Sequence, residues 1–559
     1  MNKALFFGLL LVVALFASAS SPASGEDGSD LILRHGVFYP VASPTPIHGS
    51  LVVRNGRISF LGDDAGALTH ARPGARVIEL AGKAVTPGLI DAHSHLVGLG
   101  DALVEVDLVA TSSFEEVIAR VHAAAAGRPS GTWIAGRGWD QNDWPERSFP
   151  THERLSAALP DHPVWLTRVD GHAALLNARA MTVLGIGPAV VDPPGGRFER
   201  DGAGRPTGVL IDRAMDVAAQ IPAPDAAERQ RRLAAAAARA VAVGLTTVTD
   251  MGVGPADIEA YRALTKAGRL PLRAALFLTD DAELLADWFA RGPEIDPAAR
   301  LLVRGVKLYA DGALGSRGAA LVEPYSDDPS NLGLLTASHD HLADVARRAL
   351  AAGFQVGIHA IGDRGNLVTL DAIEAAFGGR PRPELRWRLE HAQVMRLADI
   401  ERTARLGVIF SVQPTHATSD MPWAGDRVGE RRLAGAYAWR KALVAGGQLA
   451  LGSDFPVESV EPLLGLYAAV SRQDRAGAPA GGWLPEERLT RHEALRGFTL
   501  DAARSLFLDT EVGTLDIGKR ADLVVFDRDP MTVPVAEIPN VRPVLTLVEG
   551  QVVYAAEVR

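Results

Sequence analysis

The stretch LIDAHSHL, residues 89–96, places two histidines, His93 and His95, directly after an apolar run. Alternate side chains of a β-strand point to the same face, so a strand here would present both imidazoles together. Imidazole is a preferred ligand of Zn²⁺ and related metals. The stretch therefore predicts a buried strand that ends in a metal-binding pair.

A second His-x-His pair, His339 and His341, occurs in ASHDHL, residues 337–342. It opens a segment with helical periodicity, and Ser338 is a favourable helix N-cap. Residues i and i+2 of a helix do not share a face. We expect these two histidines to lie on the surface without a metal.

Seven more apolar runs follow and alternate with helical stretches, which is the pattern of parallel β/α units. Eight such units are typical of a (β/α)8 barrel. The predicted strands are 88–95, 245–250, 271–278, 303–309, 354–359, 386–391, 408–412 and 449–454. The fold class predicted is therefore α/β, with a TIM barrel over residues 87–512.

The two chain ends, residues 30–86 and 513–559, instead contain short strands separated by tight turns. Neither end can bury a sheet alone, so we expect one composite β-sandwich built from both. About 130 residues separate the first barrel strand from the next helix, which is too long for a structureless loop. We expect an insert subdomain over the barrel mouth at about residues 105–225.

Residues 1–23 have the layout of a secretory signal peptide, with Lys3, an apolar stretch, and small residues that allow cleavage after Ala19 or Ala23. The apolar stretch is too short for a comfortable membrane span, which needs roughly 20 residues. We expect an exported protein, periplasmic or secreted, with no stable membrane span after cleavage. The alternative is an uncleaved anchor.

The charge and the cysteine content narrow the choice of partners and ligands. The chain has 57 basic and 67 acidic residues, a net charge of −10, without a basic run, which argues against a nucleic-acid partner. A small-molecule substrate is the partner expected, and a homodimer is left open. Because the chain has no cysteine, a metal would be held by histidines and carboxylates.

Polar residues that suit a metal site end five of the eight predicted barrel strands. The C-terminal ends of barrel strands meet at one mouth, where active sites form. These residues are His93, His95, Lys307, His359, His391 and Asp454. The sequence thus predicts that they converge on one metal-binding pocket.

Lys307 is the unusual member, because an ammonium group repels a cation. A lysine in a partly dry pocket has a lowered pKa, and its neutral amine can capture CO₂ as a carbamate with anionic oxygens. The alternative for Lys307 is a buried ion pair with a nearby carboxylate such as Asp311. The alternative for Asp454 is a helix N-cap.

Seven segments in order resemble the metal-dependent amidohydrolase superfamily, and most closely its family 3 branch, the YtcJ-like hydrolases. The segments are TPGLIDAHSHL (86–96), GVKLYADGALGSR (305–317), HAIGD (359–363), LEHAQ (389–393), SVQPTH (411–416), LGSDFPV (451–457) and GTLDIGKRADLVVFD (513–527). The resemblance covers nearly the whole chain after residue 30. It implies a distorted (β/α)8 barrel with a β-sandwich from both chain ends.

The resemblance also implies a role for each site residue. His93 and His95 would hold one metal, and His359 and His391 a second. Lys307 would be an N6-carboxylated bridge between the two ions. Asp454 would bind metal and move protons as a catalytic residue. The ligands suit one or two Zn²⁺ ions, with Mn²⁺, Fe²⁺ and Co²⁺ as alternatives.

The predicted insert and the barrel loops supply further candidates. The stretches WD and RVDGH resemble family segments that contact substrate over the mouth, and the alternative is that they stabilise the insert. His172 is predicted to stabilise the oxyanion. The remaining candidates for substrate contact are Trp139, Asp140, Arg168, Asp170, Arg317 and His416. For Arg317 the alternative is a pair with a neighbouring loop.

These groups together predict hydrolysis of an amide-type C–N bond outside peptides by a metal-activated water. The same site would also suit cleavage of an ester or lactone, or deamination of a ring. A more distant alternative is an exported protein that keeps a metal for structure alone. An open coordination position would favour catalysis, and a closed shell would favour structure.

Overall fold

A computed structural model describes residues 30–296 and 298–556 of the chain. The predicted signal peptide, residues 1–23, lies outside the described residues. In the described part, no helix is long and apolar enough to cross a membrane.

Eight parallel strands form the central sheet, in the order β20-β19-β18-β17-β16-β14-β13-β6. The bounds are β6 Leu89–Ser94, β13 Leu245–Val253, β14 Arg273–Leu278, β16 Leu301–Tyr309, β17 Gln355–Ala360, β18 Arg388–His391, β19 Ile409–Val412 and β20 Leu449–Leu451. The short β15, Glu294–Ile295, pairs with β16 in the antiparallel sense. All eight predicted strands are present, and the predicted barrel fold is confirmed.

Backbone hydrogen bonds join the ends of the first and last barrel strands. The N–H of Asp454 donates to the carbonyl of His93 over 2.7 Å, and the N–H of His95 donates to the carbonyl of Phe455 over 2.8 Å. The two chain segments are therefore held side by side at the barrel mouth. This contact brings the first predicted ligands next to the last.

Helices follow the barrel strands and cover them. They are α2 Leu96–Ala102, α6 Ala226–Ala242, α7 Pro255–Lys266, α8 Ala282–Arg291, α9 His339–Ala351, α10 Asp363–Ala376, α11 Leu397–Leu406, α12 Pro414–Asp420, α13 Ala424–Leu433, α14 Trp439–Val444, α15 Pro462–Ser471, α16 Arg491–Gly497 and α17 Leu500–Ser505. Helical cover on a parallel sheet explains why the strands are buried nearly throughout.

The predicted helix N-cap and the predicted surface position of ASHDHL are confirmed. Ser338 caps α9, and its side chain accepts the backbone N–H of His341. His339 and His341 are exposed, and the His341 ring lies 2.7 Å from the Asp280 carboxylate. This second His-x-His pair lies on a helix N-terminus and not at the end of a barrel strand.

A six-stranded sheet lies in sequence between β6 and α6 and forms the insert. Its order is β11-β12-β10-β9-β8-β7. The strands are β7 Val106–Asp107, β8 Ile134–Trp139, β9 Val164–Arg168, β10 Ala173–Leu176, β11 Gly196–Arg200 and β12 Pro206–Asp212, with helices α3 Phe114–Ala125, α4 His152–Ala158 and α5 Ala178–Val183. The sheet has hydrophobic clusters of its own on both faces. The insert is therefore a subdomain, while its predicted bounds, 105–225, stay a prediction.

Strands from both chain ends form a third sheet, in the order β23-β22-β21-β5-β1-β2-β3, with β4 beside β1. The strands are β1 Leu31–Phe38, β2 Ile47–Arg54, β3 Arg57–Gly62, β4 Arg76–Glu79, β5 Ala84–Pro87, β21 Leu523–Phe526, β22 Pro543–Val548 and β23 Gln551–Ala555, and α1 is Asp64–His70. Antiparallel pairing of β5 with β21 joins the two ends. A two-layer sandwich over 30–86 and 513–559 stays a prediction.

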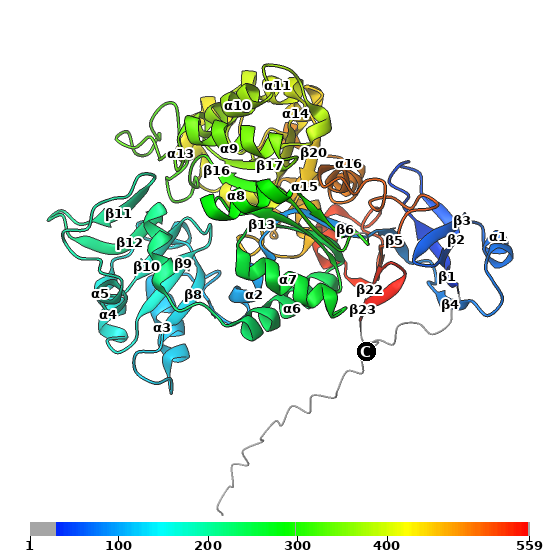
Figure 1. Cartoon of the computed structure of the whole chain (residues 1–559), viewed down its shortest axis with the longest axis horizontal. Coiled ribbons are helices and arrows are strands. Elements are labelled where there is room, and N and C mark those ends of the chain that lie inside the picture. Colours follow the sequence, from blue (N-terminus) through cyan, green and yellow to red (C-terminus); the bar gives the residue numbers. More distant parts are fainter. Residues whose placement is uncertain (1–29, 297, 557–559) are drawn as a thin grey trace, which may run out of the picture.

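Figure 1 shows this end sheet, in blue and red, and the cyan insert at opposite ends of the long axis, with the barrel between them. A buried ion pair ties the end sheet to the barrel. Arg273, at the start of β14, is fully buried and donates to both carboxylate oxygens of Asp522, over 2.7 Å and 3.1 Å. The insert therefore lies on the side of the barrel opposite the end sheet.

Candidate active site

Three of the predicted ligands owe their position to local backbone geometry at the barrel mouth. His391 and Asp454 adopt left-handed backbone conformations, with φ of 70° and 65°. Such conformations are unfavourable for residues other than glycine and cluster at functional sites. His95 precedes α2, whose first N–H groups, at Leu96 and Val97, donate to the Asp250 carboxylate over 3.1 Å and 3.2 Å.

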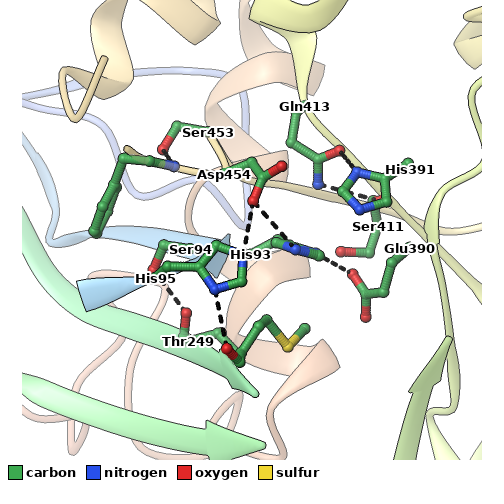
Figure 2. A network of polar contacts seen from close by, with 12 residues as sticks. His93, Ser94, His95, Thr249, Glu390, His391, Ser411, Gln413, Ser453 and Asp454 are labelled. Carbon is green, nitrogen blue, oxygen red and sulfur yellow. Dashed lines mark hydrogen bonds and ion pairs between the residues drawn. The ribbon is translucent and has the colours of Figure 1, made fainter. Parts of the chain in front are cut away.

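Figure 2 shows His93, His95, His391 and Asp454 grouped around one point. One Asp454 carboxylate oxygen lies 3.4 Å from Nε2 of His93 and 3.1 Å from Nε2 of His95. Ligand atoms of His93, His391 and Asp454 all lie within 4.8 Å of one another. Two imidazoles and a carboxylate at this spacing are a donor set that suits a borderline divalent metal.

Lys307 and His359 complete the group. Nζ of the buried Lys307 lies 3.3 Å from Nε2 of His93. The ring of His391 lies 4.6 Å from the rings of both His93 and His359, measured between centroids. The structure therefore brings all six predicted residues together, and their individual roles as ligands stay predictions.

Hydrogen bonds from neighbouring groups orient three of these rings. Nδ1 of His93 lies 2.6 Å from the Glu390 carboxylate, and Nδ1 of His391 lies 2.8 Å from the Gln413 side-chain oxygen. Nδ1 of His95 lies 2.9 Å from the carbonyl of Met251. An imidazole that donates through Nδ1 keeps the lone pair of Nε2 free for a metal.

Burial controls the protonation of the group. It lowers the pKa of His93 to about 4 and that of Lys307 to about 8. Burial also holds the pKa of His359 and of His391 well below the usual value. The imidazoles of His93, His359 and His391 are therefore neutral at pH 7, as metal ligands must be, and Lys307 has an accessible neutral form.

Neither alternative for Lys307 and Asp454 agrees with the structure. The Asp311 carboxylate accepts the backbone N–H groups of Ala320, Ile361 and Gly362 and forms no ion pair with Lys307. The helix after Asp454 begins only at Pro462. The side chains of Lys307 and Asp454 are therefore available to bind a ligand in the pocket.

His172 reaches the site from the insert. Its Nδ1 lies 2.7 Å from the carboxylate of Asp212, and its ring lies 4.9 Å from the ring of His359. Burial lowers the pKa of His172, but the hydrogen bond to Asp212 and the charges of Asp212, Asp170 and Asp454 together outweigh it and raise the pKa above the usual value. His172 is thus placed to donate a proton or a hydrogen bond into the pocket.

Two cavities open from the site. The larger is about 650 Å³ and is lined by His95, Lys307, His172 and Asp454 among others. The second is about 600 Å³, and it shares His172, His359, His391 and Asp454 with the first. Cavities of this size hold small molecules rather than folded proteins.

The predicted substrate contacts divide between the cavities and the protein interior. Asp140, Arg168 and Asp170 line the second cavity, but the buried Arg168 donates to both carboxylates and to the Gln141 side chain. His416, on α12, also lines it, with its ring 5.8 Å from the ring of His391 and Nε2 3.6 Å from Asp454.

For Trp139 and Arg317 the structure gives other roles. The fully buried Trp139 packs in the core of the insert, and its indole N–H donates to the carbonyl of Leu166 over 2.8 Å. Arg317 pairs with Asp327 over 2.9 Å, the neighbouring-loop alternative. Neither lines the two cavities, so these positions do not support substrate contact, which stays a prediction for both residues.

Several functional side chains escaped the sequence analysis. Glu390 is fully buried, and Asp212 supports His172 from the last strand of the insert. The signal for Glu390 was present, because a carboxylate inside a predicted barrel strand requires buried partners. Arg388 and His93 supply them and, against the effect of burial, hold the pKa of Glu390 well below its usual value.

Comparison with known proteins agrees with this geometry. The model of the "Amidohydrolase family" matches residues 76–554. The Bacillus subtilis protein YtcJ, named as an amidohydrolase, is 32% identical over 87% of this chain and 92% of its own. The "N-substituted formamide deformylase" of Arthrobacter pascens is 30% identical over 90% of this chain and 94% of its own.

A solved structure extends the likeness to the fold. An uncharacterised metal-dependent hydrolase from Pyrococcus furiosus is 32% identical, with a TM-score of 0.70, over 90% of this chain and 100% of its own. Family model, relatives and structure thus agree over nearly all of the described residues. The chain belongs to the amidohydrolase family, in its YtcJ-like branch, and is a metal-dependent hydrolase.

Proposed function

We propose that the protein hydrolyses an amide-type C–N bond, outside peptides, in a small N-acyl or N-formyl amine. The observation that carries the proposal is the convergence of six residues from five strand ends at the barrel mouth, where five of them line one cavity and the sixth, His93, lies beside Lys307, His391 and Asp454. The name of the Arthrobacter pascens relative supports an amide of this kind. The size of the cavity supports a small substrate.

The site is proposed to hold one or two divalent ions, with Zn²⁺ as the first candidate. The neutral histidines and Asp454 would be the ligands, and a carboxylated Lys307 would be a further one. Such an ion lowers the pKa of water toward 7 and polarises a carbonyl group. Side chains of the protein would transfer the proton and stabilise the oxyanion.

Asp454 is proposed to accept a proton from the attacking water and to return it to the leaving nitrogen. The contacts of its carboxylate with His93 and His95 support this role, because they hold the base beside two residues that would bind the ion. His172, held by Asp212, would donate a hydrogen bond to the oxyanion that develops on the carbonyl oxygen.

The first test is metal analysis of the purified protein beside a substrate panel. The panel contains N-acyl and N-formyl amines, matched esters and lactones, and aminopurines. Turnover of the amides ahead of the others is the expected result. Preference for an ester, a lactone or an amino-substituted ring would replace the proposed bond type, and inactivity of the metal-loaded protein would favour a structural metal.

We also propose that residues 1–23 export the protein to the periplasm or the medium. The support is the order of charged, apolar and small residues in this segment. Cell fractionation with and without residues 1–23 tests it, and retention of the full chain in the cytoplasm would contradict it. Light scattering would show whether the protein is a homodimer.

A further inference from the structure

Arg137, on β8 of the insert, lines the same 650 Å³ cavity as Lys307 and Asp454. One of its terminal nitrogens donates to the carbonyl of Val169 over 3.0 Å. Among the described residues, no carboxylate forms an ion pair with this guanidinium, and its Nε is buried without a hydrogen-bond partner. The remaining donors of the guanidinium stay available to a ligand.

The other charges around the cavity are mostly compensated within the protein. Ion pairs hold five of the acidic residues that line it. These pairs are Asp101 with Arg232, Asp257 with Arg229, Asp280 with His341, Asp212 with His172, and Asp216 with Arg213. Asp170 is held by Arg168. Glu105 also lines the cavity and forms no ion pair among the described residues. Of the two arginines in the lining, Arg213 pairs with Asp216, and Arg137 has no carboxylate partner in the described part of the chain.

The surroundings of Arg137 favour a ligand over a purely structural role. Burial lowers its pKa, and the carboxylates of Glu105, Asp454 and Asp170 offset only part of that effect. A partly buried cation without a partner is unfavourable, and a bound anion removes the penalty. Arg137 and Asp454 line the same cavity, which places the guanidinium on the wall of the proposed substrate site.

The backbone beside Arg137 leaves room for such a ligand. The guanidinium lies over Gly171, which has a φ of 75°, and a Cβ there would stand 3.6 Å from its nearest nitrogen. A guanidinium offers two parallel N–H groups to one carboxylate. A small substrate could then reach Arg137 with its carboxylate and Asp454 with its amide.

We propose that Arg137 binds a carboxylate of the substrate, so that the preferred substrates are N-acyl or N-formyl amino acids rather than neutral amides. This assignment rests on the proposed amide hydrolysis and narrows its substrate class. The alternative is that Arg137 only supports the turn at Val169–Gly171. The two roles differ in what a carboxylate on the substrate does.

Matched substrate pairs test the assignment on the metal-loaded full-length protein. The pairs are N-formylalanine with N-formylethylamine, N-formylleucine with N-formyl-3-methylbutylamine, and N-formylphenylalanine with N-formyl-2-phenylethylamine, with both enantiomers of each acid. We expect a preference for the acid of about tenfold to a hundredfold in kcat/KM. Arg137→Met should abolish this ratio, and Arg137→Lys should keep part of it.

Arg205→Met is the control, because Arg205 is exposed on the same subdomain and pairs with Asp201. It should keep the wild-type ratio. A structural role would lower both members of a pair together in Arg137→Met and Arg137→Lys, leaving the ratio unchanged, and this result would overturn the assignment. So would the absence of any preference in the wild-type enzyme.

Calorimetric binding of the same compounds separates this assignment from the proposed hydrolysis. If no amide is hydrolysed, the proposed function fails, while the role of Arg137 is still decided by binding. Tighter binding of the acids, lost in Arg137→Met, supports the assignment. Equal binding of both members in all three pairs, or binding of neither, overturns it.

Discussion

At the scale of the residue, Asp454 has to satisfy both a backbone and a chemical requirement. Its φ of 65° is left-handed, which asparagine also tolerates, so Asp454→Asn should keep the backbone while removing the base. We expect kcat to fall by about a hundredfold or more, with metal retained at least in part. Steady-state kinetics beside metal analysis checks this. Near-normal turnover would exclude Asp454 as the proton shuttle.

Lys307 gives a second test at this scale. In its neutral form, Nζ would form a bond to the carbon of CO₂ and release a proton, which gives a carbamate. We expect metal reconstitution of the apoprotein to be slower in buffer freed of CO₂, and bicarbonate to restore it. Lys307→Met should take up metal poorly in both buffers. Identical wild-type rates with and without CO₂ would remove the carbamate.

The ligands could be predicted from the sequence, but their supporting residues could not. His93, His359 and His391 each end a segment that the sequence predicts as a barrel strand, so the convergence of strand ends at a barrel mouth places them together. Glu390 and Asp212 act through partners that lie 297 and 40 residues away in the sequence. Such pairs depend on side-chain packing across strands, which hydrophobic periodicity does not encode.

At the scale of the element, the loop after β16 forms a close contact with the insert. A Cβ at Gly312 would stand 2.4 Å from the Asp212 carboxylate, so Gly312→Ala should displace Asp212 and with it His172. We expect kcat to fall about tenfold, with overpacking costing about 1–3 kcal/mol of stability. Gly202→Ala, where no atom lies within 4 Å, is the matched control.

Kinetics and thermal unfolding of both glycine variants decide this prediction. A fall in kcat for Gly312→Ala without a matching fall for Gly202→Ala would support positioning of His172 by the loop. Equal activity of the two variants would show that the contact is not needed for catalysis.

The barrel strands were predictable because each is a short apolar run between helical segments. The sequence did not predict which face of each insert strand is buried. Trp139 lies on a strand, and alternation predicts two possible directions for its side chain without saying which one is covered. The structure covers that face with Trp144 and Phe149, so the ring packs there and does not reach the cavities.

At the scale of the whole molecule, the Arg273–Asp522 pair holds the end sheet to the barrel at the start of β14, away from the mouth. Asp522→Ala leaves a buried guanidinium with a weaker partner, and we expect a loss of about 3 kcal/mol. Arg273→Met combined with Asp522→Leu should recover most of it. Thermal unfolding measures both.

Activity below the unfolding temperature is the control for this pair. It should be unchanged, because neither residue lies near the metal-binding group. A loss of activity in the folded Asp522→Ala protein would contradict the view that the end sheet only supports the barrel. The fold class could be predicted from length and pattern, but this interface depends on two residues 249 positions apart.

The pairing of β5 with β21 also has a consequence for biosynthesis. β5 leaves the ribosome early, yet the strand that covers its edge follows more than 430 residues later. The nascent chain must therefore build the entire barrel while one edge of its first sheet stays without a neighbour. That edge can be covered only after the chain has been translated through β21. A complete end sheet therefore forms only after the entire barrel has been synthesised.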